Sequence, residues 1–224
     1  MIFAAYAVLV LAQAQASPIM IVDLRPQLKS YGLPPRSQGP RPTCSVFTTV
    51  AAIEYAYAKK MGKGTPLSVE YLNWAGDNII NDHGNDGAFF HNVLAGFDKY
   101  GICPESLMPY KHPYDPARAP SAAALVSANT ILNLGLKTQW IKRWNMNRPM
   151  SERQFQMILD ALRKGYPVAA GSDHSRLLVG FSMDANQPGG GTFVSKDSGL
   201  GGYGEVTFEF VKTRVYDAFF VTEK

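Results

Sequence analysis

The feature that most constrains the fold is a cysteine that opens an expected helix, six residues after a glutamine. From Cys44 to about residue 60, apolar side chains recur at spacings of three and four, which predicts a helix with one buried face. The unpaired N–H groups and positive dipole end of such a helix lower the pKa of a thiol at its N-terminus. The side-chain amide of Gln38, together with the N–H of Cys44, could stabilise an oxyanion. This segment therefore indicates a cysteine nucleophile for acyl chemistry, provided that a histidine base lies elsewhere.

A histidine with suitable surroundings stands near the other end of the chain. His174 precedes an apolar run and lies 130 residues after Cys44, and Asp197 follows farther on. A cysteine, then a histidine, then a residue that accepts from histidine Nδ1–H is the chain order of a nucleophile, its base and the group that orients the base. We therefore expect Cys44 to attack a carbonyl, His174 to transfer the proton and Asp197 to hold the imidazole tautomer.

The order and spacing of these segments resemble those of the papain-like cysteine peptidases, in their bacterial form. The resemblance runs from about residue 22 to the C-terminus and is carried by Val22–Arg25, Gln38, Cys44, Leu67–Leu72, Asp86–Ala88, Gly101–Ser106, Asp173–His174 and Lys196–Ser198. It implies an α+β fold in which a helical lobe packs against an antiparallel, β-barrel-like lobe, with the active-site cleft between them. It also implies Gln38 as an oxyanion-hole residue, and Asp86, Gly87 and Asp173 as substrate-binding residues.

Three positions depart from the pattern of that family. Asp197 replaces the usual Asn, and a carboxylate there should let His174 hold its proton to higher pH. Gly199 stands where the family has a Trp that shields this pair from water. Pro42 and Thr43 replace a Gly-Ser pair, and the proline has no N–H and stiffens the approach to the nucleophile. These departures motivate an alternative to the peptidase, namely a catalytically weak or inactive papain-like binding module.

The N-terminal segment suggests export. Residues 2–12 form an uncharged apolar run that is too short to span a bilayer, and small residues follow it. We expect residues 1–16 to be a signal peptide cleaved after Ala14 or Ala16, and the protein to be secreted or periplasmic. A buried N-terminal strand or helix is the alternative. The resemblance begins so soon after this segment that we expect no inhibitory propeptide, and we expect a protein inhibitor or no zymogen step at all.

Cys44 and Cys103 are the only cysteines in the sequence. Two cysteines in an exported chain suggest a disulfide, which would consume the nucleophile. The family usually has a bridging cysteine three residues before the nucleophile, but Arg41 stands there, so this bridge is absent. We therefore interpret Cys44 as a free thiol and Cys103 as a small buried apolar residue. A Cys44–Cys103 disulfide is the alternative interpretation.

The rest of the chain, residues 17–224, is expected to form one catalytic domain with two lobes. The helical lobe covers about residues 38–112, and the β-rich lobe covers about 113–224 together with an extended N-terminal segment. A proline-rich stretch at 111–120 marks the crossing between them. Further helices are expected at 68–74, 88–100, 121–130 and, after a capping box, 151–165. Strands are expected at 137–144, 167–172, 175–182, 191–196, 205–211 and 216–222.

Composition narrows the classes of partner. The chain has 224 residues, of which 46% are hydrophobic and 18% charged, as in ordinary globular proteins. Its net charge of +4 comes from scattered basic residues, so no nucleic-acid partner is expected. The segment from Asp82 to Gly87 only faintly suggests a calcium loop, because Gly84 stands where an oxygen ligand is needed, and no metal or cofactor is expected.

We expect a monomer that acts on a peptide or protein substrate and does not bind membranes after signal cleavage. Acyl transfer to an amine, in place of hydrolysis, is a third and weaker hypothesis.

Overall fold

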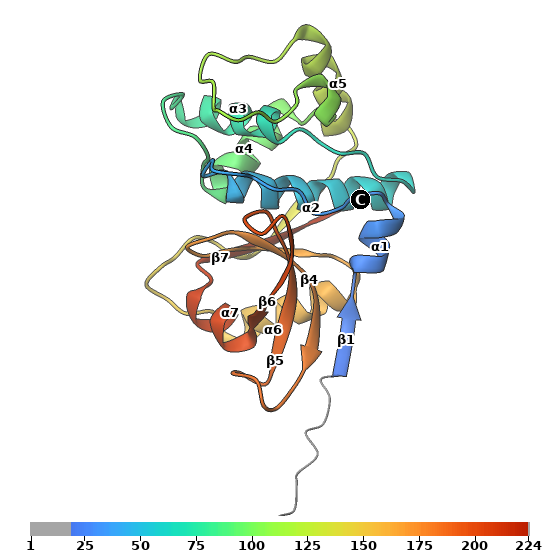
Figure 1. Cartoon of the computed structure of the whole chain (residues 1–224), viewed down its shortest axis with the longest axis vertical. Helices are drawn as coiled ribbons and strands as arrows, with labels where there is room; N and C mark the ends of the chain where they lie inside the picture. Colours follow the sequence, from blue (N-terminus) through green and yellow to red (C-terminus); the bar gives the residue numbers. More distant parts are fainter. Residues whose placement is uncertain (1–18, 224) are drawn as a thin grey trace, which may run out of the picture.

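The computed structural model describes residues 19–223 and has a helical half and a sheet half (Figure 1). The α+β architecture that the sequence predicts is confirmed. The expected signal peptide lies outside the described residues. Within the described part of the chain, no helix combines the length and the apolar character needed to cross a membrane.

Most of the expected elements are present in the expected order along the chain. The helical half contains α2 (Cys44–Met61), α3 (Val69–Ile80), α4 (Phe90–Tyr100), the short 3-10 helix η1 (Glu105–Leu107) and α5 (Ala122–Leu132). The sheet half contains β1 (Ile19–Asp23), α1 (Arg25–Ser30), β2 (Lys137–Lys142), α6 (Glu152–Arg163), β3 (Val168–Gly171), β4 (Arg176–Met183), β5 (Gly191–Asp197), β6 (Gly202–Thr207), α7 (Phe208–Arg214) and β7 (Asp217–Thr222).

Helix α2 lies between the two halves, as Figure 1 shows. It packs against α3 and α4 on one side and against β3, β4 and β7 on the other. Because both sides are covered, nearly all of its residues from Val46 to Ala58 are buried. Gly62 ends the helix in the left-handed conformation, with a φ of 74°. The first residue of this central helix is Cys44, so the fold brings the nucleophile predicted from the sequence to the junction of the halves.

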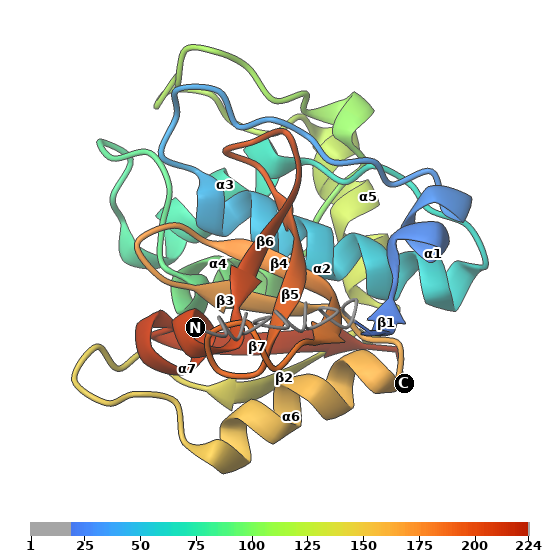
Figure 2. The ribbon, with the colours of Figure 1, turned by 60° about the horizontal axis from the view of Figure 1, so that its bottom comes forward.

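The strands form one antiparallel sheet in the order β2-β7-β3-β4-β5-β6. Strand β4 pairs with β5 along one edge, and its other edge is shared between β3 and β1. Alternate residues of β3 face opposite cores. Ala169 belongs to the core under α2, whereas Val168 and Ala170 belong to the core closed by α6 and α7. Helices α2 and α6 therefore cover opposite faces of the sheet (Figure 2).

Two expectations about local structure are wrong. The strand expected at 205–211 ends at Thr207, and α7 begins directly after it. Val206, Phe208 and Phe210 alternate as in a strand, but the Thr207 side chain accepts from the N–H of Phe210 and caps a helix. Helix α1 was not expected within the proline-rich N-terminal segment. It has a proline in its first turn, where no N–H is needed, and buries Leu28.

The crossing between the halves also differs from the expectation. Helix α5 follows the proline-rich stretch at 111–120, yet it packs against α4 in the helical half. Its buried residues are Ala124, Ala128 and Ile131, and the first two are small enough for close approach to a neighbouring helix. The chain therefore passes to the sheet half between α5 and β2.

Candidate active site

Cys44 occupies the first position of α2, and its thiol meets the loop between β3 and β4. There it hydrogen-bonds to the His174 side chain and to the backbone N–H and side chain of Ser175. Burial on its own would raise the pKa of Cys44, but His174 and Ser175 outweigh it and the pKa of the thiol is lowered. The arrangement therefore favours a thiolate.

The imidazole of His174 lies between Cys44 and Asp197. Its Nε2 atom is 2.7 Å from Oδ1 of Asp197, which leaves Nδ1 for the thiol. The expectation that Asp197 would accept from Nδ1 is therefore wrong, although its partnership with the ring is observed. The hydrogen bond with Cys44 raises the pKa of His174, burial opposes it, and Asp197 adds to the rise. A lowered cysteine pKa beside a raised histidine pKa favours a thiolate–imidazolium pair.

Asp197 is held as a carboxylate at the end of β5. Burial opposes its ionisation, but hydrogen bonds from His174 and from the N–H groups of Gly199 and Leu200 lower its pKa. Nε of Arg176 lies 3.5 Å from Oδ2. These contacts fix the carboxylate beside the imidazole, as the sequence analysis expected.

Gly199 leaves one side of this pair open. A cavity of about 390 Å³ is lined by Gly199, Leu200, His174 and Asp197, and the His174 side chain keeps 29% of its accessible surface. The cavity beside Gly199 therefore reaches the exposed side of His174, while the Asp197 side chain is only 8% exposed.

Gln38 is fixed between the segment before α2 and the segment after β5. Its Nε2 donates to the backbone oxygen of Arg41 at 2.8 Å, and its Oε1 accepts from the Ser198 hydroxyl at 2.7 Å. The N–H of Gln38 also donates to the carbonyl of Ser198. A carboxamide has two N–H groups, so one remains for a further acceptor.

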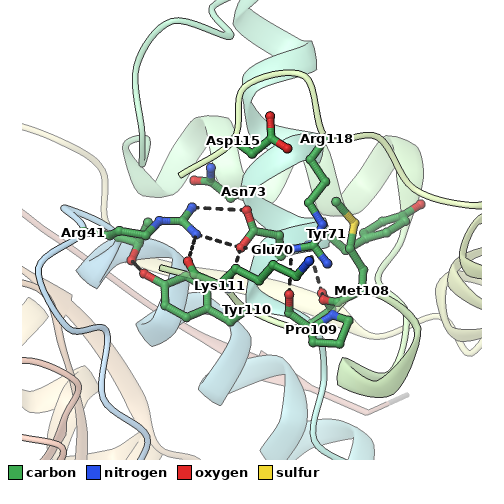
Figure 3. Close-up of polar contacts among 12 residues, drawn as sticks. Arg41, Glu70, Tyr71, Asn73, Met108, Pro109, Tyr110, Lys111, Asp115 and Arg118 are labelled. Carbon is green, nitrogen blue, oxygen red and sulfur yellow. Dashed lines mark hydrogen bonds and ion pairs between the residues drawn. The ribbon is translucent and has the colours of Figure 1, made fainter. Parts of the chain in front are cut away.

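Arg41 stands at the position where the family has a bridging cysteine, and it lies in a cluster of charged side chains. It is 4% exposed, and its guanidinium donates to Glu70 on α3 at 2.7 Å (Figure 3) and to both oxygens of Asp86 at 2.8 Å. It also donates to the backbone oxygen of Lys111 and lies 4.4 Å from the centre of the Tyr110 ring. We call Arg41, Glu70, Asp86 and Tyr110 the Arg41 cluster. It ties the residues just before Cys44 to α3 and to the loop before α4.

A second cavity of about 390 Å³ opens beside Cys44 and is lined by both halves of the molecule. Gly87 forms part of its wall at a φ of +84°, and a Cβ atom there would lie 2.3 Å from the backbone oxygen of Pro42. Only glycine fits this close approach. Asp217 and Trp144 line the cavity from the sheet half. We call this space the Cys44 cavity.

The structure brings most of the predicted site residues together. His174 contacts both Cys44 and Asp197, and Asp86 and Gly87 line the Cys44 cavity. The Asp86 carboxylate, however, is bound to Arg41. Asp173 is exposed, accepts from the Tyr216 hydroxyl and does not line this cavity.

Three further residues of the site, Ser175, Trp144 and Asp217, carry no motif in the sequence. Ser175 follows the predicted base directly, so its position next to His174 was the one signal available. Trp144 and Asp217 lie far from the motifs in sequence, and only the sheet pairing brings them to the cavity. Both cysteines are free, and Cys103 is buried, so the alternative disulfide is not formed. In residues 19–223, no three His, Cys, Asp or Glu side chains are grouped so that they could hold a metal ion.

Comparison with known proteins supports the fold. No family model matches the sequence. No curated protein matches it either. Among solved structures, xylellain, a cysteine protease from Xylella fastidiosa, superposes with a TM-score of 0.67 at 17% identity, covering 94% of this chain and 87% of that one. Digestive procathepsin L 3 of Tenebrio molitor gives a TM-score of 0.64 at 20% identity, covering 94% of this chain and 71% of that one.

The proform of the ragweed pollen allergen Amb a 11, a cysteine protease, gives a TM-score of 0.65 at 19% identity, covering 95% of this chain and 69% of that one. At these identities the likeness establishes the architecture. The chain has the papain-like fold, the fold of the cysteine proteases whose motifs its sequence resembles.

Proposed function

We propose that this protein is a cysteine-type peptidase, an endopeptidase that hydrolyses peptide bonds at Cys44. The observation that carries the proposal is the Cys44–His174–Asp197 line at the junction of the two halves, with the pKa of the thiol lowered and that of the imidazole raised. Export and a monomeric state rest on the sequence alone and are part of the proposal.

In the proposed reaction, the Cys44 thiolate attacks the carbonyl carbon of the scissile bond. The N–H of Cys44 and the second N–H of the Gln38 amide donate to the oxyanion, and each such donor contributes roughly 10²–10³ in rate. His174 then gives its proton to the leaving amine, and a thioester remains on Cys44. Neutral His174 takes a proton from water, the resulting hydroxide attacks the thioester, and the carboxylic acid product leaves as the thiolate re-forms.

The first test is the intact mass of the protein after exposure to a peptidyl epoxide under mild reducing conditions. We expect one adduct on the wild type and none on Cys44→Ala, whereas Cys103→Ala should label as the wild type does because Cys103 is buried. Peptide hydrolysis should fall by at least about 10³-fold in Cys44→Ala. Unchanged turnover in that folded variant would end the proposal.

The binding-module hypothesis predicts the opposite result in the labelling experiment. It expects peptide binding without any Cys44 adduct, and it is motivated by the open side of His174 at Gly199. Products formed in the presence of an added amine would separate hydrolysis from acyl transfer.

A further inference from the structure

A buried carboxyl group with one oxygen that lacks a hydrogen-bonding partner among residues 19–223 lies at the wall of the Cys44 cavity. Asp217, the first residue of β7, is 1% exposed, and its Oδ1 has no hydrogen-bond partner among residues 19–223. A buried polar atom without a partner is costly, so it calls for an explanation. Asp217 also lines the cavity into which Cys44 faces, so the carboxyl lies at a place where a ligand could complete its bonding.

The sheet makes room for this carboxyl. Asp217 pairs in register with Gly171 of β3. A Cβ atom on Gly171 would lie 2.0 Å from Oδ1 of Asp217 and 3.0 Å from the ring of Phe90. Any side chain at position 171 would therefore displace the carboxylate. The glycine and the aspartate together form a niche at the edge of the cavity, bounded by an aromatic ring.

The neighbouring charged groups do not balance the charge of an ionised Asp217. Lys142 on β2 is the cation whose field reaches it, but the Lys142 ammonium donates to the backbone oxygens of Arg148 and Val215 at 2.8 and 2.6 Å. Burial raises the pKa of Asp217 to about 7, and Lys142 only partly opposes that rise. The free energy needed to ionise the buried group would be recovered if a second cation bound to it.

The other acids of the cavity are already engaged. Asp86 is bound by Arg41, and the half-exposed Asp82 accepts from the Asn85 amide at 2.7 Å. Asp217 is thus the acid in this cavity whose hydrogen bonding is incomplete.

We propose that Asp217 binds a cationic group of the substrate in the Cys44 cavity, next to the bond that is cleaved. The proposal rests on the peptidase function proposed above and names the class of substrate. The cation is either the side chain of a Lys or Arg residue or the free N-terminal ammonium of a peptide. Ala88, Phe90 and Trp144 also line the cavity and would pack against an aliphatic stem whose charged end reaches Asp217.

The preference for a cationic substrate should depend on pH. Only ionised Asp217 attracts a cation strongly, so the preference for a basic substrate should rise as the pH increases through about 7. Lys142 faces Asp217 from β2, β3 contributes no titratable group, and the cavity's other titratable side chains are Cys44, Asp82 and Asp86. A ratio of two substrates measured on the same enzyme cancels the titration of Cys44 and His174.

The test compares N-acetylated peptides that carry either arginine or its neutral isostere citrulline, at each of the two positions before the scissile bond. At pH 8 we expect kcat/KM to favour arginine at one position by roughly 10- to 100-fold in the wild type, which is the size of a buried charged hydrogen bond. Asp217→Asn should bring that ratio close to one. A parallel series with a free N-terminus and neutral side chains tests the ammonium, whose binding would instead give a preference for the unacetylated peptides.

Asp82→Asn is the matched control, because it removes the same charge from the rim of the same cavity. The arginine preference should persist in this variant. An equal loss in Asp82→Asn and Asp217→Asn would overturn the proposal, since the preference would then come from the general negative field. A wild-type ratio near one in every series would also overturn it, while the peptidase function would stand.

Binding to the Cys44→Ala protein separates the two proposals. If the enzyme never turns over, yet Cys44→Ala binds the arginine peptide more tightly than the citrulline peptide and Asp217→Asn removes the difference, then the cation site stands and the peptidase function falls. Should Asp217→Asn not fold, the wild-type ratio at pH 5.5 and 8 gives the same test. A ratio that is unchanged with pH contradicts the role of Asp217.

Discussion

The two sides of the cleft handle buried charge differently. On the helical side, Arg41 is 4% exposed and is bound by two carboxylates, a backbone oxygen and an aromatic ring. On the sheet side, Asp217 is 1% exposed, and one of its oxygens lacks a partner among the described residues. Both groups lie close to Cys44 in the fold, so the difference between them concerns their bonding and not their depth.

This difference indicates different roles. Burial disfavours the charged form of Arg41, but its hydrogen bonds to Asp86 and Glu70 outweigh burial and raise its pKa above the ordinary value for arginine. A saturated cluster of this kind holds backbone in place, here the residues before Cys44 and the loop that carries Gly87. Burial without such bonds instead raises the pKa of Asp217 to about 7. An unsaturated group of this kind destabilises the free protein, and in our proposal a cationic group of the substrate completes its bonding.

Breaking the saturated cluster should have the largest effect. Arg41→Met leaves Glu70 and Asp86 as buried carboxylates without their main cation, and we expect it to lower the free energy of unfolding by about 3–5 kcal/mol. Labelling of Cys44 by the epoxide should fall as well, since the loop before the nucleophile loses its anchor. Urea unfolding at pH 7 measures the first effect and intact mass the second.

Arg163→Met is the control for this substitution. Arg163 pairs with Asp160 on the surface of α6, where both side chains are about half exposed, and the loss should stay below about 1 kcal/mol. Equal losses in the two variants would show that the Arg41 cluster behaves as an ordinary surface pair.

Neutralising the unsaturated group should have a smaller effect of opposite sign. The pKa of Asp217 is about 7 in the folded protein and near 4 when unfolded, so the folded state loses stability as pH rises from about 4 to about 7. Asp217→Asn removes this loss. We expect its gain in unfolding free energy over the wild type to grow by about 2–3 kcal/mol between pH 5 and pH 8.

Urea titrations of both proteins across this pH range supply the measurement. The pKa of Asp77 is also raised to about 7 by burial, but Asp77 is present in both proteins and cancels in the difference. A difference in unfolding free energy that is constant with pH would mean that the pKa of Asp217 is not raised in the folded protein.

The smallest effect should come from the rim of the Arg41 cluster. The Tyr110 hydroxyl lies 2.7 Å from the Thr43 hydroxyl and donates to the backbone oxygen of Gln38, while the Tyr110 ring lies against the guanidinium. Tyr110→Phe keeps the ring and loses the two hydrogen bonds, so we expect a loss of about 1 kcal/mol in thermal or urea unfolding. A loss as large as that of Arg41→Met would mean that the hydroxyl, and not the ion pairs, holds the cluster.

Local patterns predicted the elements that depend on local signals. The start of α2 at Cys44, its end at Gly62 and the capping box of α6 at Ser151 are as expected. The misassigned strand at 205–211 shows the limit of such signals, because the alternating apolar residues there fit a strand as well as a capped helix. The Thr207 cap and the core under α6 decided in favour of the helix.

The site divides in the same way. Cys44, His174 and Asp197 were identified from residue types and flanking segments, and the contacts among them follow the order in which they were expected. The prediction of which His174 ring nitrogen meets Asp197 was wrong, because the orientation of the ring depends on where the thiol lies in space. The ion pairs of Arg41 could not be predicted, and the sequence showed only that it replaces a cysteine. A long side chain gives no sign of which distant carboxylates it will reach.

Residue identity and spacing alone were enough to predict the reactive groups of the candidate site, namely a thiol at a helix start, a histidine with a carboxylate partner, and a backbone amide and carboxamide nearby. These depend on residue identity and short spacing. Which buried charges are paired became visible from the packing of helices and strands alone. Pairing between Arg41 and Glu70, or its absence at Asp217, depends on atoms brought within a few ångströms by helix packing and strand register, and neither distance is encoded in any local stretch of the chain.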